Sequence, residues 1–150
     1  MAKHKTIIEN ESFGLLSHVT GDLWQQGIEV TFLGRSWKVP LYVDLPSNDP
    51  TPEPQQVRAH KAFLARTEEF LDSAEAGIVE HYCSLRNVDA TAATRAVEMG
   101  VRLESISFPY ARSLATFGLL CSCDWDEERG LAARFEEGRL VEVGSQDLLL

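Results

Sequence analysis

The run Cys121-Ser-Cys-Asp-Trp-Asp-Glu-Glu-Arg-Gly130 lies in the segment that decides the fold, residues 117–150. From Phe117 to Trp125 every second residue belongs to an apolar set, namely Phe117, Leu119, Cys121, Cys123 and Trp125. Side chains on a strand alternate between its two faces, so this segment is predicted to be a strand with one apolar face. Residues 126–130 are polar and end in glycine, which reaches a positive φ without steric cost. The run is therefore predicted to be a strand that ends in an acidic turn.

Two further strands are predicted after this turn. Leu131–Phe135 and Leu140–Val143 alternate in the same way, and Glu137-Gly138 between them is typical of a tight hairpin. Val141 and Val143 are predicted to face inward. The chain ends in three leucines, and leaving them in water would forfeit roughly 2 kcal/mol of burial for each. The tail is therefore predicted to dock on the core.

Three motifs of this segment resemble those of a bacterial family of small α+β domains of unknown function. They are Trp125-Asp-Glu-Glu-Arg-Gly-Leu131, Glu137-Gly-Arg-Leu-Val-Glu-Val-Gly144 and Gln146-Asp147. Family members end in a W-D-x-E-H-G-hydrophobic pattern, a short hairpin and a V-G-x-Q-D pattern, and the resemblance covers about residues 28–150. Arg129 stands where members commonly carry His, so any chemistry or metal binding by that His should be lacking here. Some relatives are associated with bacterial toxin systems as immunity proteins, and the resemblance implies such a function.

An N-terminal β-hairpin is predicted from Ile28–Leu33 and Trp37–Leu45, joined by a turn at residues 34–36. Both segments alternate, so one face of the hairpin should be buried. Pro40 has no N–H group, so the second strand is predicted to be an edge there or to carry a bulge. Residues 1–23 show only weak strand patterns.

A long helix is predicted from Gln55 to about Leu85, because apolar residues recur there at three- and four-residue steps. Gly77 is the position at which a bend or a break into two helices is expected, and Asn87 is a stop signal. A short helix should follow at Ala90–Met99. After it, Val101–Phe108 alternates like a strand, with one slip in register.

Together these elements predict a single α+β domain over residues 1–150. An antiparallel sheet, made of the N-terminal hairpin and a C-terminal meander, is expected to pack on one long helix. A chain of this length can bury a core without disulfides or metals. The predicted core consists of Val30, Phe32, Val43, Leu64, Leu71, Ile78, Phe117, Leu119, Cys121, Trp125 and Val143.

The formal net charge of −9, from 23 acidic and 14 basic residues, bears on the class of partner. It disfavours nucleic acid, whose phosphates are bound by Lys and Arg. It suits a basic protein partner attracted by the long-range field, although acidity is also common in cytoplasmic proteins. No apolar run of about 18 residues is present, so no membrane span is predicted. The odd count of three cysteines and the lack of an apolar signal core indicate a cytoplasmic location.

The acidic turn provides the candidate partner-binding residues, Asp124, Asp126, Glu127, Glu128 and Arg129. Its carboxylates could instead hold calcium or magnesium, or supply an acid–base pair, as in a metal-dependent or hydrolytic enzyme. The EF-hand spacing and a phosphate-binding loop are both absent from the sequence. The simplest interpretation is an exposed acidic turn. Trp125 is predicted to be buried; if it faced outward, it would be an anchor for a partner.

A second candidate site combines His81, Cys83, Cys121 and Cys123 as a zinc set, if the helix end meets the strand. The spacing lacks the usual C-x-x-C pair, and an apolar strand is where buried free cysteines occur. No metal site, cofactor or catalytic residue is therefore predicted, since no nucleophile or nucleotide motif is present either.

The leading hypothesis is a non-enzymatic protein-binding domain, specifically an immunity protein that neutralises a cognate toxin by occlusion. The first alternative is the metal-dependent or hydrolytic enzyme. The second is a regulatory accessory domain without a toxin partner. The sequence separates neither the second alternative from the leading hypothesis nor a monomer from an oligomer.

Overall fold

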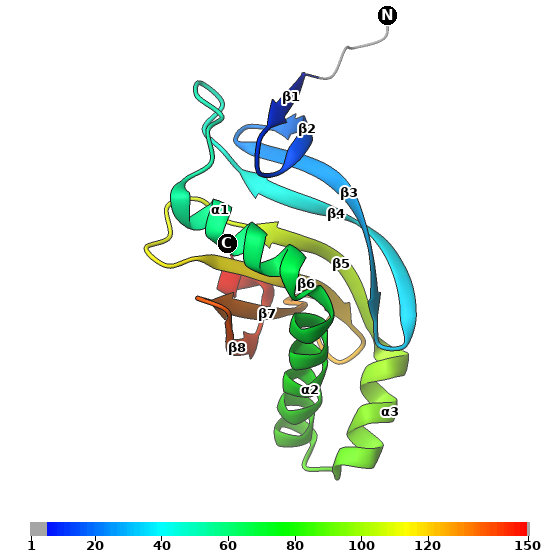
Figure 1. Cartoon of the computed structure of the whole chain (residues 1–150). Helices are drawn as coiled ribbons and strands as arrows, with labels where there is room; N and C mark the ends of the chain where they lie inside the picture. The colour runs from blue at the N-terminus through cyan, green and yellow to red at the C-terminus, as the bar shows by residue number, and fades with distance from the viewer. Residues whose placement is uncertain (1–5, 150) are drawn as a thin grey trace, which may run out of the picture.

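The computed structural model describes residues 6–149, which form an α+β fold (Figure 1). The strands are β1 Ile7–Asn10, β2 Gly14–Thr20, β3 Leu23–Phe32, β4 Arg35–Asp44, β5 Val101–Phe108, β6 Thr116–Cys123, β7 Leu131–Glu136 and β8 Arg139–Gly144. The helices are α1 Pro54–Ala65, α2 Thr67–Arg86, α3 Ala90–Gly100 and the short 3₁₀ helix η1 Gln146–Leu149. The α+β prediction is thus confirmed.

All of these strands form one sheet, in which they follow one another in sequence order. Neighbouring strands are antiparallel except β4 and β5, which pair in parallel between Leu41–Val43 and Ile106–Phe108. Parallel neighbours need a long crossover, and the three helices provide it. The prediction of antiparallel strands is therefore correct within each half of the sheet, whereas the parallel junction between the halves was not predicted.

The predicted long helix is two helices, α1 and α2, that lie over one face of the sheet (Figure 1). The break falls at Arg66, whose φ of −136° and ψ of 35° leave the helical region, and not at Gly77. Gly77 is helical and lies against β8, where an added Cβ would come 2.5 Å from Cδ2 of Leu140, so glycine is needed there for close packing. Asn87 ends α2 in the left-handed conformation, as predicted.

The core lies between the sheet and the helices and is dominated by phenylalanine rings. Phe117 and Phe135 stack with centroids 4.8 Å apart, and Phe70 from α2 meets Phe117 edge-on at 5.0 Å. Leu64 is a wrong core prediction, since 56% of it is exposed on the outer side of α1. Trp125 and Val143 are only half-buried. The remaining predicted core residues are buried, so the alternation patterns locate most of the interior correctly.

Two irregularities of the sheet were visible in the sequence. Pro40 lies just before Leu41, where the pairing of β4 with β5 begins, so β4 is locally an edge there. The pairing of β5 with β6 shifts between Leu103 and Ser105, which is the predicted slip in register. A further shift between Arg134 and Phe135 alters the pairing of β7 with β8.

The C-terminal part of the sheet corrects one prediction and confirms another. Val141 does not face inward, because 47% of it is exposed, and Leu140 packs against the core instead. The register shift between β7 and β8 accounts for this exchange, since a slip of one residue reverses the faces of a strand. Leu149 in η1 is buried, so the tail docks as predicted, while Leu150 lies outside the described residues.

Candidate binding site at the acidic turn

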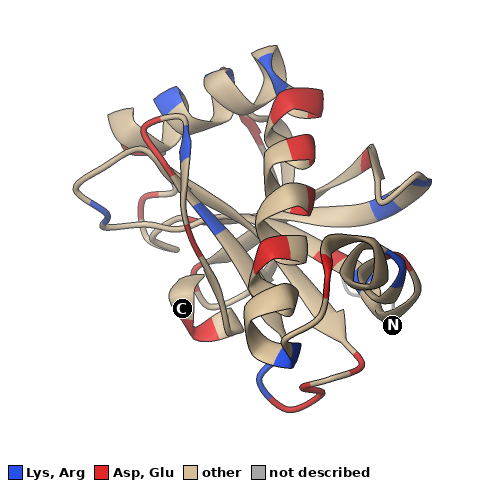
Figure 2. Ribbon diagram, turned by 90° about the horizontal axis from the view of Figure 1, so that it is seen from below, with Lys and Arg blue, Asp and Glu red and all other residues tan. Residues whose placement is uncertain are grey.

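The predicted acidic turn joins β6 to β7 and lies beside the C-terminal end of α2 (Figure 2). The α3–β5 junction approaches it from the other side, where the N–H of Asp124 donates to the carbonyl of Gly100 at 3.0 Å. Oδ1 of Asp124 also lies 3.3 Å from the guanidinium of Arg102. Both side chains are exposed, so this ion pair contributes little free energy. Asp124 thus mainly orients the start of the turn.

Asp126 folds the middle of the turn. Its Oδ1 accepts the backbone N–H of Arg129 at 3.1 Å, and its carbonyl accepts the N–H of Gly130 at 3.0 Å. A side-chain oxygen that bonds a later backbone N–H is the usual way in which Asp closes a turn. Gly130 then takes a φ of 66°, which favours glycine. Asp126 is therefore committed to the structure of the turn.

Glu127, Glu128 and Arg129, unlike the two aspartates, do not use their side chains to stabilise the turn. All three are exposed, and within residues 6–149 none of their side chains forms a hydrogen bond or an ion pair. Of the five predicted site residues, these three are free to contact a partner. All five residues thus lie in one turn. Asp124 and Asp126 stabilise the turn, whereas Glu127, Glu128 and Arg129 are exposed and could contact a partner.

Trp125 links the turn to α2. Its ring meets Tyr82 edge-on with centroids 4.8 Å apart, and the side chain as a whole is half-buried. The prediction that Trp125 is buried is therefore only half correct. A strand that runs into a turn loses its alternation, and Trp125 lies just beyond the end of β6 at Cys123.

Two hollows flank Trp125. The first, here called the His81 hollow, has a volume of about 420 Å³. Its lining comprises His81, Leu85, Arg86, Trp125, Asp126, Arg129, Gly130, Leu131, Gly144 and Ser145. The second, of about 370 Å³, lies between Trp125, Tyr82 and Met99. Arg86 lines both hollows. Arg86, Tyr82 and Met99 were not predicted to be site residues, because only the packing of α2 and α3 against the turn brings them there.

The motifs quoted for the family resemblance meet in space behind the turn. Nε2 of Gln146 donates to the carbonyl of Cys121 at 2.9 Å, and the N–H of Gln146 donates to the carbonyl of Arg129 at 3.0 Å. An added Cβ on Gly130 would lie 2.6 Å from Nε2 of Gln146. Gly130 and Gln146 therefore fit each other, and this part of the pattern serves to hold the turn in place.

The four residues of the candidate zinc set are not brought together. Cys121 and Cys123 are buried in β6, and burial raises the pKa of both thiols. His81 and Cys83 are half-buried on α2, and His81 faces its own hollow. Within the described part of the chain, no group of three or more His, Cys, Asp and Glu side chains is placed to hold a metal ion.

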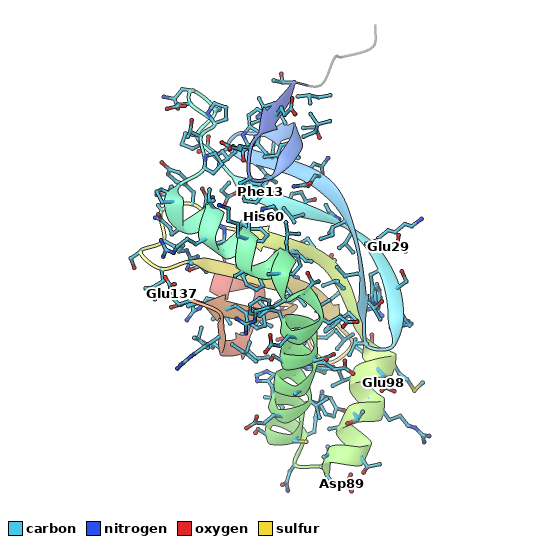
Figure 3. The ribbon with its side chains drawn as sticks, in the orientation of Figure 1. Phe13, Glu29, His60, Asp89, Glu98 and Glu137 are labelled. Carbon is cyan, nitrogen blue, oxygen red and sulfur yellow. The ribbon has the colours of Figure 1, made fainter. Side chains whose placement is uncertain are left out.

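His60 is the strongly perturbed histidine, and it lies far from the turn (Figure 3). It is 3% exposed, stacks on Phe13 at 4.0 Å and has Nδ1 3.3 Å from Oγ of Ser12. Burial lowers its pKa to about 4. A histidine with such a pKa is a weak general base at neutral pH, so the contact with Ser12 gives little support to a nucleophile pair.

Comparison with known proteins adds a family assignment. No curated protein and no solved structure matches the chain. Across residues 6–149, moreover, no helix has the length and apolar character that crossing a membrane requires. One protein family does match, over residues 13–150, and its description is "Domain of unknown function (DUF6985)". The match covers the whole sheet except β1, together with all of the helices, and the chain therefore belongs to the DUF6985 family.

Proposed function

We propose that this chain is a non-enzymatic protein-binding domain whose contact surface is centred on Trp125, Glu127, Glu128 and Arg129. The observation that carries the proposal is the contrast within the turn. Asp124 and Asp126 are used to build it, whereas Glu127 and Glu128 are exposed beside a half-buried tryptophan and have no partner among residues 6–149. An accessible tryptophan surrounded by charges is the usual composition of an interface hot spot and its rim.

The charge of the molecule supports a basic partner. The chain carries a net charge of −9, and the outer side of α2 adds exposed carboxylates at Glu68, Asp72 and Glu80 (Figure 2). Such a field accelerates the encounter with a positively charged protein and is weakened by salt. Glu127 and Glu128 would then form rim contacts, which mainly affect the association rate and the choice of partner.

The specific form of the proposal is an immunity protein that acts in the bacterial cytoplasm. Its partner would be a cognate toxin, and binding would occlude the toxin's active surface. The support for this step is the sequence resemblance, in which relatives are associated with toxin systems. A regulatory accessory domain would use the same surface with another partner, so the identity of the captured protein separates the two.

The test is a tagged pull-down from the native cell with the full chain and with the E127K/E128K variant as baits. We expect the wild-type chain to retain a basic protein at equal stoichiometry and the variant to lose most of it. Glu11→Lys, an exposed site on the distant β1–β2 turn, is the matched control and should retain the partner. Equal capture by E127K/E128K would show that the surface is wrong.

If the captured protein is toxic, co-expression with the wild-type chain should restore growth and co-expression with E127K/E128K should not. A captured protein without toxicity would favour the regulatory role. A preparation with no partner at all would contradict tight constitutive binding.

A further inference from the structure

The His81 hollow is positively charged, although the protein as a whole is strongly acidic. Arg86 approaches it from the last turn of α2, His81 from five residues earlier on the same helix, and Arg129 from the acidic turn. Asp126 is the only acidic residue in its lining. Two permanent cations thus face one carboxylate, and Oδ1 of that carboxylate already accepts the N–H of Arg129.

Most other arginines have partners within the protein. Arg35 donates to the carbonyls of Glu98 and Val101, and Arg112 has an interaction of its own. Ion pairs engage Arg58, Arg66, Arg102 and Arg134. Among residues 6–149, the guanidinium groups without a partner belong to Arg86, Arg95, Arg129 and Arg139. Two of these four line the same hollow, in a chain where carboxylates outnumber basic groups.

The other walls of the hollow suit an apolar body with a polar end. Trp125 and the exposed Leu85 provide an aromatic and an aliphatic surface, while Ser145 adds a hydroxyl. The volume of about 420 Å³ lies within the range of sites for small molecules.

We propose that the His81 hollow binds a small organic anion. Arg86 and Arg129 hold its carboxylate or phosphate oxygens, and its apolar part lies against Trp125. A guanidinium group presents two parallel N–H donors that match such oxygens, which makes Arg the preferred residue for both groups. The proposal goes beyond the protein-binding function and does not depend on it, because it needs no protein partner.

The test is a titration of the full ¹⁵N-labelled chain, followed by two-dimensional NMR, with three probes of similar shape. Benzoate carries a carboxylate, phenyl phosphate carries a phosphate, and benzamide is the neutral counterpart of benzoate. We expect saturable shifts at the Trp125 indole N–H and at the amides of Gly130, Gly144 and Ser145 with at least one anion. Benzamide should bind at least about tenfold more weakly, because hydrogen bonds to charged groups are about twice as strong as neutral ones.

Arg86→Gln and Arg129→Gln should each weaken binding of the anion about tenfold, since each removes one charged donor pair. Arg139→Gln is the matched control, because Arg139 is also exposed and unpaired but lies outside the hollow. It should leave the affinity unchanged. Whichever anion binds more tightly identifies the group that the site prefers.

Three results would overturn the proposal. The first is the absence of saturable shifts at these residues with either anion. The second is equal affinity for benzamide and benzoate, which would make the hollow a merely apolar slot. The third is unchanged affinity in both arginine variants, provided that their spectra show a folded protein. None of these results bears on the pull-down with E127K/E128K, so the two proposals fail separately.

Discussion

His60 is a titratable side chain that is almost completely buried, with 3% of it exposed. Its ring lies between Phe13 and Phe108, with centroids at 4.0 and 5.5 Å, beneath the β1–β2 hairpin. Ser12 Oγ makes a polar contact with Nδ1 of the ring at 3.3 Å. Protonation would place a cation among aromatic rings with no carboxylate bonded to it, which explains why burial lowers its pKa to about 4.

The first prediction follows from this pKa. The unfolded chain binds a proton at His60 near pH 6.5, whereas the folded chain does so only near pH 4. Stability contributed by the neutral ring is therefore present above pH 6.5 and is lost as the pH falls toward 4. We expect this loss to reach about 2 kcal/mol of unfolding free energy.

Urea denaturation at pH 7 and pH 4.5 measures this loss, and His60→Phe is the reference because its ring stacks without titrating. The wild-type protein should lose about 2 kcal/mol more than H60F between these pH values. Equal pH dependence in wild type and H60F would mean that His60 does not titrate as described.

Local sequence patterns predicted most of the elements of the fold. Alternation located β3 to β8, and the slip in β5 was visible because Leu103 and Ile106 break the two-residue period. The end of α2 followed from Asn87. The break at Arg66 was missed, because neither glycine nor proline marks it. The parallel β4–β5 pair was also missed, since strand direction depends on a crossover of more than 50 residues between Asp44 and Val101.

The candidate site, like the fold, was predicted only in part from the sequence. The turn and its five charged residues were predicted from the sequence, because turn chemistry is local. The sequence could not separate Asp126, whose side chain accepts a backbone N–H of the turn, from Glu127, whose side chain forms no hydrogen bond within the described part of the chain. It also could not reveal the hollows, since Arg86 lies 43 residues before Arg129 and joins it only through packing.

The second prediction belongs to the scale of elements and concerns the docking of η1 on β6. Gly118 of β6 lies directly under Leu149, and an added Cβ would also come 2.8 Å from the carbonyl oxygen of Ala133. The backbone of β7 cannot move away without breaking the sheet. Gly118→Ala should therefore destabilise the protein by about 1–3 kcal/mol, as overpacking does in other cores.

Chemical denaturation of G118A measures this change. Gly27→Ala on β3 is the matched control, because no heavy atom lies within 4 Å of its Cβ position and its φ is not positive. It should be neutral or slightly stabilising, since alanine restricts the unfolded chain. Similar effects of the two substitutions would contradict the close packing of η1 on β6.

At the scale of the whole molecule, the two halves of the sheet share one core. The buried cluster extends from Phe13 and Trp24 in the first half, β1–β4, to Phe117 and Phe135 in the second half, β5–β8. Phe63 of α1 and Phe70 of α2 belong to the same cluster. The parallel junction of β4 and β5 is short, at three residue pairs. Cooperative unfolding of the two halves must therefore rest mainly on this continuous core and on the helices. α1 contacts β5 and β6, and α2 contacts β3 as well as β7 and β8.

This arrangement predicts a single cooperative unfolding transition. Trp24 reports on the first half and Trp125 on the second, so 5-fluorotryptophan labelling with ¹⁹F NMR can follow both in one urea titration. We expect the two resonances to lose intensity at the same midpoint, as in two-state domains of this size. Gly118→Ala should lower both midpoints equally, although Gly118 and Trp24 lie in different halves. A lower midpoint for Trp24, or a lowered midpoint for Trp125 alone in G118A, would contradict this prediction. Either result would show that β1–β4 unfold separately and that the shared core does not couple the halves.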